Sequence, residues 1–484
     1  MANGHNPSVR IRMYRQGLGD CFLLTFREDN DREFNMMIDC GLLQGTQNGK
    51  EIMRQVVSDI EQTLRSGGNA TARLDAVVLT HEHADHISGF SQASDVFANI
   101  EFDEVWAAWV DDDTHPKYKL VRERFHKQVT GLQAALAQMN PDSQGALKLS
   151  VETLLKEFFE DDVLGTASQN TTRPSAWSSA LTKSKRPPKF FTPGMMFPLP
   201  GFDDIRIYVL GPSEDYETFT QVNPPADDTY RTKDGLGFAL LDSFVAAVGG
   251  VGTPLSTEAF QPFEKRFRID TAAAQTNEFF KTHYGFDAGA AEEWRRINDD
   301  WLSVAGGLAL KLDSYTNNTC LALAIEFISS GKVLLFPGDA QFSNWLSWQK
   351  LTWDIPDADG RKEKVTTKDL LARTVLYKVG HHGSHNATLK THGLEMMTSP
   401  DLMAIIPVDR SRAKDKKWEM PEKNLFDRLV DRTRGRVILA DDTDATLKAR
   451  CKDQNFAGKV SFAGTLNRTA GSQPEPICIE LRVE

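Results

Sequence analysis

Short apolar runs separated by turn residues recur through the first hundred residues and predict β-strands. Two runs lie within 9–27, on either side of a turn at 16–20, and a third covers 34–38. Apolar residues at helical spacing predict a helix over 51–65. The run 74–79 then predicts a buried strand that leads into polar residues. This alternation is typical of an α/β fold, in which functional residues gather where strands end.

Two long stretches interrupt this pattern and predict insertions. Helical spacing appears at 117–137 and 147–159, whereas 170–189 is polar, basic and typical of a loop. Residues 213–305 are mixed in character, with a helical run at 292–302.

Strand-like sequence resumes between and after these stretches. A turn at 329–331 joins two of the runs and predicts a hairpin, and a helix is expected at 425–430. The strands are expected at 205–210, 321–328, 333–336, 375–379, 402–406 and 436–440. The sequence therefore predicts a core in three pieces with two insertions between them: core 1–110, helical insertion 111–189, core 190–212, second insertion 213–305 and core 306–484.

Composition limits the function classes. The net charge of −11 over 484 residues argues against a surface that binds nucleic acid as a whole, although it permits a local basic groove. The chain shows no signal peptide, and its most apolar stretch, 238–252, is too short to span a bilayer. The five cysteines are scattered and predict buried, reduced thiols, so a cytoplasmic protein without a membrane partner is expected.

The most informative stretch runs from His81 to His86 and reads HEHADH. Three of the eleven histidines of the chain fall within these six residues. Imidazole and carboxylate are good ligands for zinc, manganese or iron. In a loop that leaves a strand, His81 and His83 can face one position while Asp85 and His86 face a neighbouring one. A solvated polar loop is the alternative, but the apolar strand that leads directly into the cluster argues against it.

Two later strands also end in residues that can bind metal. The run 333–336 is followed by Asp339, and the run 375–379 is followed by His381 and His382. Taken alone, a Gly-Asp pair after a strand is common turn chemistry. The order HxHxDH, then a strand-ending Asp, then a strand-ending His is far more specific than any of its parts.

This order resembles the metallo-β-lactamase superfamily, in which Asp39 fits a motif whose carboxylate supports the ligand loop. The closer resemblance is to the hydrolase domain of the competence protein ComEC and its soluble relatives, over roughly 9–110, 190–212 and 306–450. The motifs that carry it are Gly19-Asp20, Ile38 to Gly41, Thr80 to His86, Asn317 to Thr319, Gly338-Asp339, and His381 to Ser384. The resemblance implies a four-layer αββα fold with two largely helical insertions.

The resemblance also implies roles for single residues. One divalent ion would be held by Asp85, His86, Asp339 and His381, with His381 preferred over His382. A second ion would be held by His81, His83, Asp339 and Asn318, with Asp339 as the bridge. Zinc is the first expectation and manganese the alternative, and one or two ions would generate a hydroxide that attacks the substrate. The residues expected to be catalytic are Asp39, Asp85 and Asp339.

The chain departs from the family pattern in two places. Many relatives have a further ligand His between the HxHxDH loop and the bridging Asp, whereas this chain offers only His115, His126 and His283 there, all in predicted insertions. Where relatives have His-Pro near the end, this chain has Met420-Pro421.

Several other polar residues have two interpretations. Lys378 is either an exposed strand residue or a contact for phosphate, and Ser384 is either a loop residue or a substrate contact. Two basic runs are either solvated loops or contacts for a nucleic-acid backbone. They are Lys183, Lys185, Arg186 and Lys189, and then Arg410, Arg412, Lys414, Lys416 and Lys417.

The leading function is that of a metal-dependent hydrolase, specifically a phosphodiesterase or nuclease. Hydrolysis of a small ester, lactone or amide is one alternative, and a regulatory or scaffold protein with a degenerate metal site is another. The expected substrate is a phosphodiester or other small molecule, with nucleic acid, a protein partner and a homo-oligomer left open.

Overall fold

The computed structural model describes most of the chain, and its two compact units are treated separately. The first unit comprises 1–122, 156–235 and 313–484, and the second comprises 123–155 and 236–312. All candidate metal ligands lie in the first unit. The described residues are 7–28, 32–66, 71–138, 148–149, 151–153, 155–156, 158–159, 175–215, 218, 228–229, 269, 271–284, 312–356, 362–469, 471 and 473–484.

One sheet is built mainly from the N-terminal part of the chain. Within the described residues it has eight strands, which lie side by side in the order β16 (Val460–Ala463), β17 (Cys478–Val483), β1 (Ser8–Tyr14), β2 (Cys21–Arg27), β3 (Glu33–Cys40), β4 (Ala72–Val78), β5 (Ile100–Ala108) and β6 (Lys189–Phe191). Strands β1 to β3 are antiparallel, whereas β3 to β6 run parallel to one another.

The second sheet is built mainly from the C-terminal part. Its seven strands among the described residues follow the order β15 (Val437–Leu439), β14 (Met403–Ile406), β13 (Thr374–Lys378), β10 (Lys332–Phe336), β9 (Ala322–Phe327), β8 (Phe202–Gly211) and β7 (Met196–Leu199). The predicted hairpin is confirmed, because β9 and β10 pair antiparallel across the turn at 329–331. Strands β11 (Thr352–Pro356) and β12 (Lys362–Thr366) pair as a separate two-stranded sheet, and Trp353 of β11 packs on Tyr208 of β8.

The two sheets pack face to face. Phe22 on β2 meets Phe336 on β10 with ring centroids 5.8 Å apart, and Phe26 meets Phe327 at 6.4 Å. Each such ring stabilises the fold by about 1.5–3 kcal/mol through burial. Strands in the middle of this arrangement are covered on both faces, which explains why all six residues of β9 are buried and why all but Glu326 are apolar.

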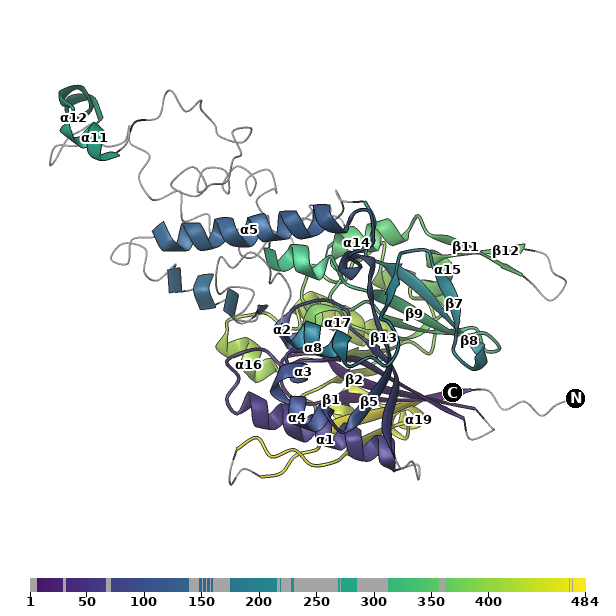
Figure 1. Cartoon of the computed structure of the whole chain (residues 1–484). Coiled ribbons are helices and arrows are strands. Elements are labelled where there is room, and N and C mark those ends of the chain that lie inside the picture. Colours follow the sequence, from purple (N-terminus) through teal and green to yellow (C-terminus); the bar gives the residue numbers. More distant parts are fainter. Residues whose placement is uncertain are drawn as a thin grey trace, which may run out of the picture. The chain divides into compact units, whose positions relative to one another are not determined.

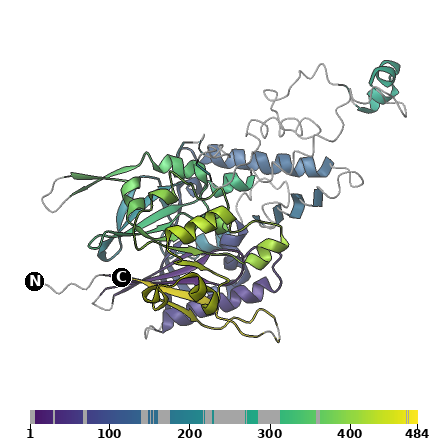
Figure 2. The same cartoon turned by 180° about the vertical axis from the view of Figure 1, so that it is seen from behind.

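Helices cover the outer faces of both sheets, and the predicted αββα fold is confirmed (Figure 1 and Figure 2). Helix α1 (Gly49–Arg65) lies on the eight-stranded sheet and contacts β4, with α3 (Gly89–Gln92), α4 (Ser94–Phe97) and α8 (Ser175–Thr182) beside it. On the other sheet, α14 (Phe342–Trp348) contacts β8 and α15 (Thr367–Ala372) contacts β10.

Further helices connect the strands of the first unit. They are α2 (Ala84–Ile87), α16 (Arg410–Asp415), α17 (Lys423–Arg432), α18 (Asp444–Arg450) and α19 (Gln454–Ala457). Helix α5 (Tyr118–Gln138) begins in the first unit and continues into the second. The second unit also contains α11 (Thr271–Thr276) and α12 (Glu278–Tyr284).

The loop predicted for 170–189 is wrong in its middle, where α8 forms. Trp177 and Ala180 of α8 are fully buried in the same core as the apolar face of α1, and this apolar face outweighs the polar composition of the stretch. The helix expected at 292–302, most of the second insertion and parts of 147–159 lie outside the described residues, so the predicted insertion boundaries stay predictions.

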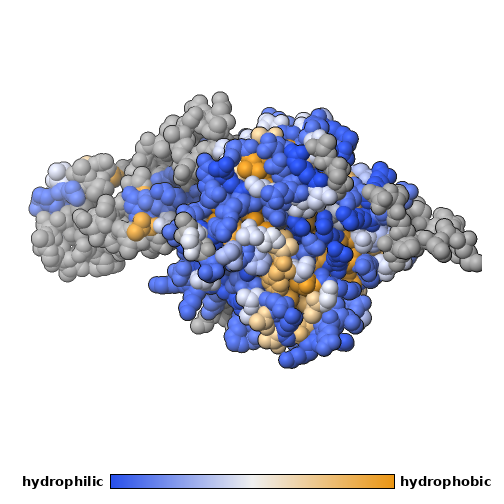
Figure 3. All heavy atoms as spheres, turned by 90° about the horizontal axis from the view of Figure 1, so that it is seen from below, coloured by the Kyte–Doolittle hydropathy of each residue, from blue (hydrophilic) through white to orange (hydrophobic). Residues whose placement is uncertain are grey.

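Two bulk expectations can be compared with the structure. All five cysteines are buried and none forms a disulfide, as predicted. None of the helices in the described part of the chain has the length and apolar character needed to cross a membrane. The face drawn in Figure 3 is mostly hydrophilic, and hydrophobic residues gather toward its middle.

Candidate metal centre

Strand ends from both sheets meet at one edge of the fold. Strands β3 and β4 run parallel, so Asp39 and the loop after β4 lie at the same edge of the first sheet. Strands β10 and β13 are likewise parallel in the second sheet, which places Asp339 beside the residues that follow β13. The backbone N–H of Leu321 donates to the carbonyl of Thr80 at 2.9 Å and ties the two edges together.

The side chain of Asp39 holds the ligand loop, residues 80–86, in place through hydrogen bonds. Its Oδ1 accepts from the backbone N–H of Thr80 at 2.8 Å, and its Oδ2 accepts from the Thr80 hydroxyl at 2.6 Å. The same Oδ2 lies 2.7 Å from Nδ1 of His86. Asp39 thus supports the loop and orients one candidate ligand, the kind of contact that fixes the tautomer of a metal-binding imidazole.

Two glycines let other backbone segments approach the loop closely. A Cβ on Gly41 would lie 2.3 Å from the carbonyl carbon of Asp85, and a Cβ on Gly19 would lie 2.7 Å from the Asp85 oxygen. That oxygen accepts from the N–H of Asp20 at 2.9 Å. The backbone of the ligand loop therefore rests directly on the backbone of these two segments.

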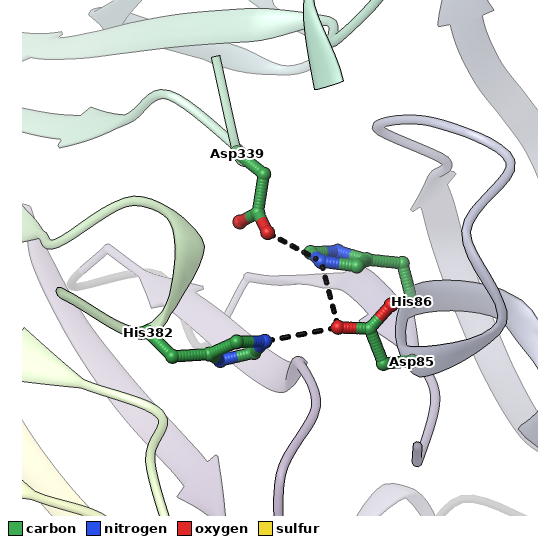
Figure 4. A group of neighbouring side chains, drawn as sticks. All are labelled: Asp85, His86, Asp339 and His382. Carbon is green, nitrogen blue, oxygen red and sulfur yellow. Dashed lines mark hydrogen bonds and ion pairs between the residues drawn. The ribbon is translucent and has the colours of Figure 1, made fainter. Parts of the chain in front are cut away.

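Four side chains converge at this edge from three separate segments (Figure 4). Nε2 of His86 lies 3.1 Å from Oδ2 of Asp339 and 3.8 Å from Oδ2 of Asp85. The same Asp85 oxygen is 2.9 Å from Nε2 of His382. One ligand atom from each of these four residues lies within 4.8 Å of the other three. We call Asp85, His86, Asp339 and His382 the four-residue cluster.

His382, rather than the predicted His381, belongs to this cluster. Both residues have a positive φ, 47° at His381 and 53° at His382, and this turn directs the second imidazole toward Asp85. Nδ1 of His382 faces the carbonyl of Pro407 at 2.7 Å. The backbone N–H of His381 donates to Oδ1 of Asp339 at 2.8 Å, and the Nδ1 of its ring is buried without a hydrogen bond. The cluster of converging atoms therefore includes His382, and which of the two imidazoles binds an ion stays a prediction.

His81 and His83 form a second pair of nitrogens next to the cluster. Nε2 of His81 lies 2.9 Å from Nδ1 of His83, and the ring of His81 is 4.2 Å from that of His86. The predicted fourth partner, Asn318, is buried, and its Oδ1 instead accepts from the side chain of Asn344 at 3.1 Å.

The three histidines considered as replacements for the missing ligand lie elsewhere. His115 pairs with Glu214 at 3.1 Å, His126 is exposed on α5, and His283 is exposed in the second unit. None of them joins the candidate centre in the part of the chain that the structure describes.

The residues of the four-residue cluster fit a divalent cation. Oδ1 of Asp85 is buried and makes no hydrogen bond, whereas the buried Nε2 of His86 and Oδ2 of Asp339 face each other as an ion pair at 3.1 Å. Leaving a buried oxygen such as Oδ1 of Asp85 without a partner costs about 1–3 kcal/mol, or more when the group is charged. Imidazole and carboxylate that face a common point are the donor set expected for zinc or manganese.

Lys378 is buried beneath the cluster, so its interpretation as an exposed strand residue is wrong. It is only 1% exposed. Its ammonium lies 2.5 Å from Oδ2 of Asp20 and donates to Oδ1 of Asp339 at 2.9 Å. These bonds occupy one oxygen of Asp339 and leave Oδ2 directed at His86.

Charges within the cluster shift the titration of its members. Burial would raise the pKa of Asp339, but Lys378 and His86 outweigh it and hold that pKa well below its usual range. Burial likewise opposes ionisation of Asp85, but His86 and His382 lower its pKa to about 2. Burial would lower the pKa of His86, yet the surrounding carboxylates, Asp339 foremost, raise it well above its usual value.

The pKa values of His81 and His83 are lowered, unlike that of His86. Burial lowers the pKa of His83 to about 3, and burial together with the neighbouring His86 places that of His81 well below its ordinary value. Both imidazoles are therefore neutral near pH 7 and have a lone pair free to bind a cation.

Aromatic side chains cover one side of the centre. The rings of Phe158 and Phe159 lie 5.4 Å and 5.1 Å from that of His83, and Phe158 stacks on Trp418 at 5.6 Å. Ser384, a predicted substrate contact, is largely buried, and its hydroxyl donates to the side chain of Asn386.

The first basic run is neutralised by the neighbouring strand β5. Lys185 pairs with Glu101 at 2.5 Å, and Arg186 and Lys189 both pair with Glu104, at 2.7 Å and 2.8 Å. The second run is partly paired as well, since Arg410 contacts Asp441 at 2.9 Å. The choice between solvated loops and contacts for a nucleic-acid backbone stays a prediction for both runs.

Two acidic residues of the centre were not among the predicted site residues. Asp20 was noted only as part of a turn motif, and Asp313 was not considered. Asp313 is 7% exposed and lies behind His83, with its Oδ1 3.7 Å from Nε2 of that ring. The surrounding sequence, KLDSYTNN, mixes polar and apolar residues and carries no motif that marks Asp313.

Comparison with known proteins bears on the class. Residues 14–116 match the family model described as the metallo-beta-lactamase superfamily. The match includes β2 to β5 and the loop from His81 to His86, and it ends before Asp339 and His382. The chain therefore carries a metallo-beta-lactamase superfamily domain, and this superfamily consists mostly of metal-dependent hydrolases. No curated protein matches the chain.

Proposed function

We propose that the protein is a metal-dependent phosphodiesterase with a two-cation centre. The observation that carries this proposal is the adjacency of two ligand sets. The four-residue cluster lies next to the His81–His83 pair, and the rings of His81 and His86 are 4.2 Å apart. Paired sites with cations about 3.5–4 Å apart are common in phosphatases and nucleases.

Different residues of the chain would hold the two cations and orient their ligands. Asp85, His86, Asp339 and His382 would hold one cation, and His81 with His83 would hold the other. Asp339 is anchored by Lys378 through Oδ1, so its orientation is fixed before a cation binds. Asp39 would orient His86 through Nδ1. When bound, divalent cations lower the pKa of a water and neutralise the charge that develops on phosphoryl oxygens.

The order of motifs that resembles the hydrolase domain of ComEC supports a phosphodiester substrate. An extended nucleic-acid surface has less support, because three cations of the first basic run are paired with β5 carboxylates. We therefore propose a phosphodiester as the substrate class and treat DNA and RNA as particular cases to be tested.

Purified protein should be loaded with Zn²⁺ or Mn²⁺ and assayed with bis-p-nitrophenyl phosphate, single- and double-stranded DNA, RNA and a panel of lactones. We expect phosphodiester cleavage that disappears in Asp85→Ala. Cleavage that persists in Asp85→Ala would reveal a contaminant. Turnover of lactones without phosphodiester cleavage would favour the ester alternative, and no turnover with any metal would favour a degenerate site.

A further inference from the structure

Three histidines of the centre share one arrangement. Each ring directs one nitrogen toward the centre and places the other against an acceptor. Nδ1 of His86 faces Asp39 at 2.7 Å, and Nδ1 of His382 faces the carbonyl of Pro407 at 2.7 Å. Nδ1 of His81 faces the hydroxyl of Thr80 at 3.1 Å. In each case Nε2 is the nitrogen left for a cation.

His83 is turned the other way. Its Nδ1 converges with Nε2 of His81, so Nε2 is the nitrogen on the far side of the ring. That nitrogen faces Oδ1 of Asp313 at 3.7 Å, and both atoms are buried without a hydrogen-bond partner. The other oxygen of Asp313 accepts from the side chain of Asn317 at 3.2 Å, which holds the carboxylate behind the ring.

We propose that Asp313 is the positioning residue for His83. It accepts the Nε2–H of the imidazole, fixes the tautomer in which Nδ1 carries the lone pair, and so sets the affinity of a second divalent cation held by His81 and His83. The inference rests on the proposed two-cation centre and names a residue that this second site requires.

The separation of 3.7 Å between Nε2 and Oδ1 is longer than a hydrogen bond. It exceeds the 2.7–3.2 Å typical of an N–H···O bond, so the two atoms do not yet form one. A small rotation of the carboxylate about its Cα–Cβ or Cβ–Cγ bond closes the gap and satisfies both buried atoms. Phe158 and Phe159 pack on the ring of His83, which keeps the contact shielded from water and the ring in place.

A rival geometry would make Asp313 a ligand itself. Two ligand atoms around one tetrahedral zinc lie about 3.3 Å apart, which is not far from the observed separation. However, a cation at that point would use Nε2 of His83 and abandon the nitrogen that converges with His81. In the other three rings the nitrogen that faces the centre is left for a cation and the outer nitrogen faces an acceptor. By the same division, Nδ1 of His83 is left for the cation and Nε2 faces Asp313, which favours the positioning role.

Metal titration separates these roles without any substrate. Metal-free protein is titrated with Zn²⁺ by calorimetry and with Co²⁺ by visible absorption, using the wild type, Asp313→Ala, Asp313→Asn and Asp204→Asn. Asp204 is a matched control because it bonds Ser329 at the opposite end of β8 and β9. Thermal unfolding of each metal-free variant shows that it is folded.

We expect two ions in the wild type. Asp313→Ala should weaken only the second ion, by roughly 10–100-fold. Asp313→Asn should retain most of the affinity, since its amide oxygen still accepts from Nε2–H, and its Co²⁺ spectrum should match the wild type. Asp204→Asn should change neither ion.

Other outcomes would overturn the inference. Equal losses in Asn and Ala with an altered Co²⁺ spectrum would make Asp313 a ligand. A single ion in the wild type, or unchanged affinity for both ions in Asp313→Ala, would remove the positioning role. Selective weakening of the second ion in a protein that cleaves no phosphodiester would leave this inference standing while the proposed function failed.

Discussion

Nζ of Lys378 lies 2.9 Å from Oδ1 of Asp339 and 2.5 Å from Oδ2 of Asp20. One buried ammonium thus holds two carboxylates from different sheets, one on each side of the sandwich. Without it, the centre would contain several buried carboxylates with only imidazoles to balance them. The contact also decides which oxygen of Asp339 is available, because Oδ1 is already occupied.

Replacement of this ammonium should destabilise the metal-free protein strongly. We expect Lys378→Met to lower the free energy of unfolding by about 3–5 kcal/mol, since it leaves Asp20 and Asp339 buried without their cation. Urea unfolding measures the change. Lys189→Met is the control, because Lys189 is half exposed and its pair with Glu104 contributes little. An unchanged midpoint in Lys378→Met would contradict the importance of this contact.

The two neighbouring histidines should differ in their effect on metal content. We expect His382→Ala to lose the ion of the four-residue cluster, because Nε2 of His382 is one of the four converging atoms. His381→Ala should retain that ion, since His381 reaches Asp339 through its backbone N–H. Metal analysis after dialysis distinguishes the two variants. The opposite result would restore the order expected from the sequence.

Asp39 should act on metal affinity through His86. Asp39→Asn keeps the size of the side chain but weakens the bond to Nδ1 and removes the charge. We expect the affinity of the cluster for Zn²⁺ to fall by roughly 10–100-fold, as measured by competition with a chromophoric chelator. Equal affinity in Asp39→Asn and wild type would show that the carboxylate serves only the backbone of Thr80.

Binding of the first ion should release protons. Burial opposes the charge on His86 and His382, but nearby carboxylates raise the pKa of both, that of His86 well above its usual value, so the metal-free His86 ring carries a second proton near neutral pH. A protonated imidazole cannot bind a cation. Affinity should therefore rise with pH through these raised values and level off above them. Calorimetry in buffers of different ionisation enthalpy measures the protons released.

The affinity for the second ion, unlike that for the first, should not depend on the loss of protons from its ligands. The pKa of His83 is lowered to about 3 by burial, and that of His81 is also low, so both rings are neutral near pH 7 and neither carries the second proton that a cation would have to displace. The affinity of the second ion should therefore be nearly independent of pH between about 6 and 8. If the affinities for both ions rose with pH in parallel, the expected difference between the two sites would be contradicted.

Much of the fold could be predicted because its strands are buried on both faces. Continuous apolar runs such as 74–79 and 333–336 appear in the structure as β4 and β10. Strand β17 was not predicted, since its partner β1 lies at the other end of the chain and only the folded sheet brings Arg12 opposite Glu480. Helix α8 was missed because Trp177 is one of few apolar residues in a polar stretch.

The site was less predictable than the fold. Spacing alone predicts that His81 to His86 form a ligand loop, because three imidazoles and two carboxylates within six residues directly after a buried strand suit a metal ion far better than a solvated loop. It cannot choose between His381 and His382, since that choice depends on two consecutive residues with positive φ. Nor can it find Asp313, whose role depends on which nitrogen of His83 turns outward.

Gly41 has no side chain, yet it sets a limit on what the ligand loop tolerates. Any Cβ there would overlap the backbone at Asp85 and His86. In a saturation screen that selects for bound metal, alanine at this position should score as poorly as alanine at a ligand. A survey that looks only for residues able to bind an ion would overlook Gly41. The centre nevertheless requires that no side chain be present at this position, because the backbone of the ligand loop already lies there.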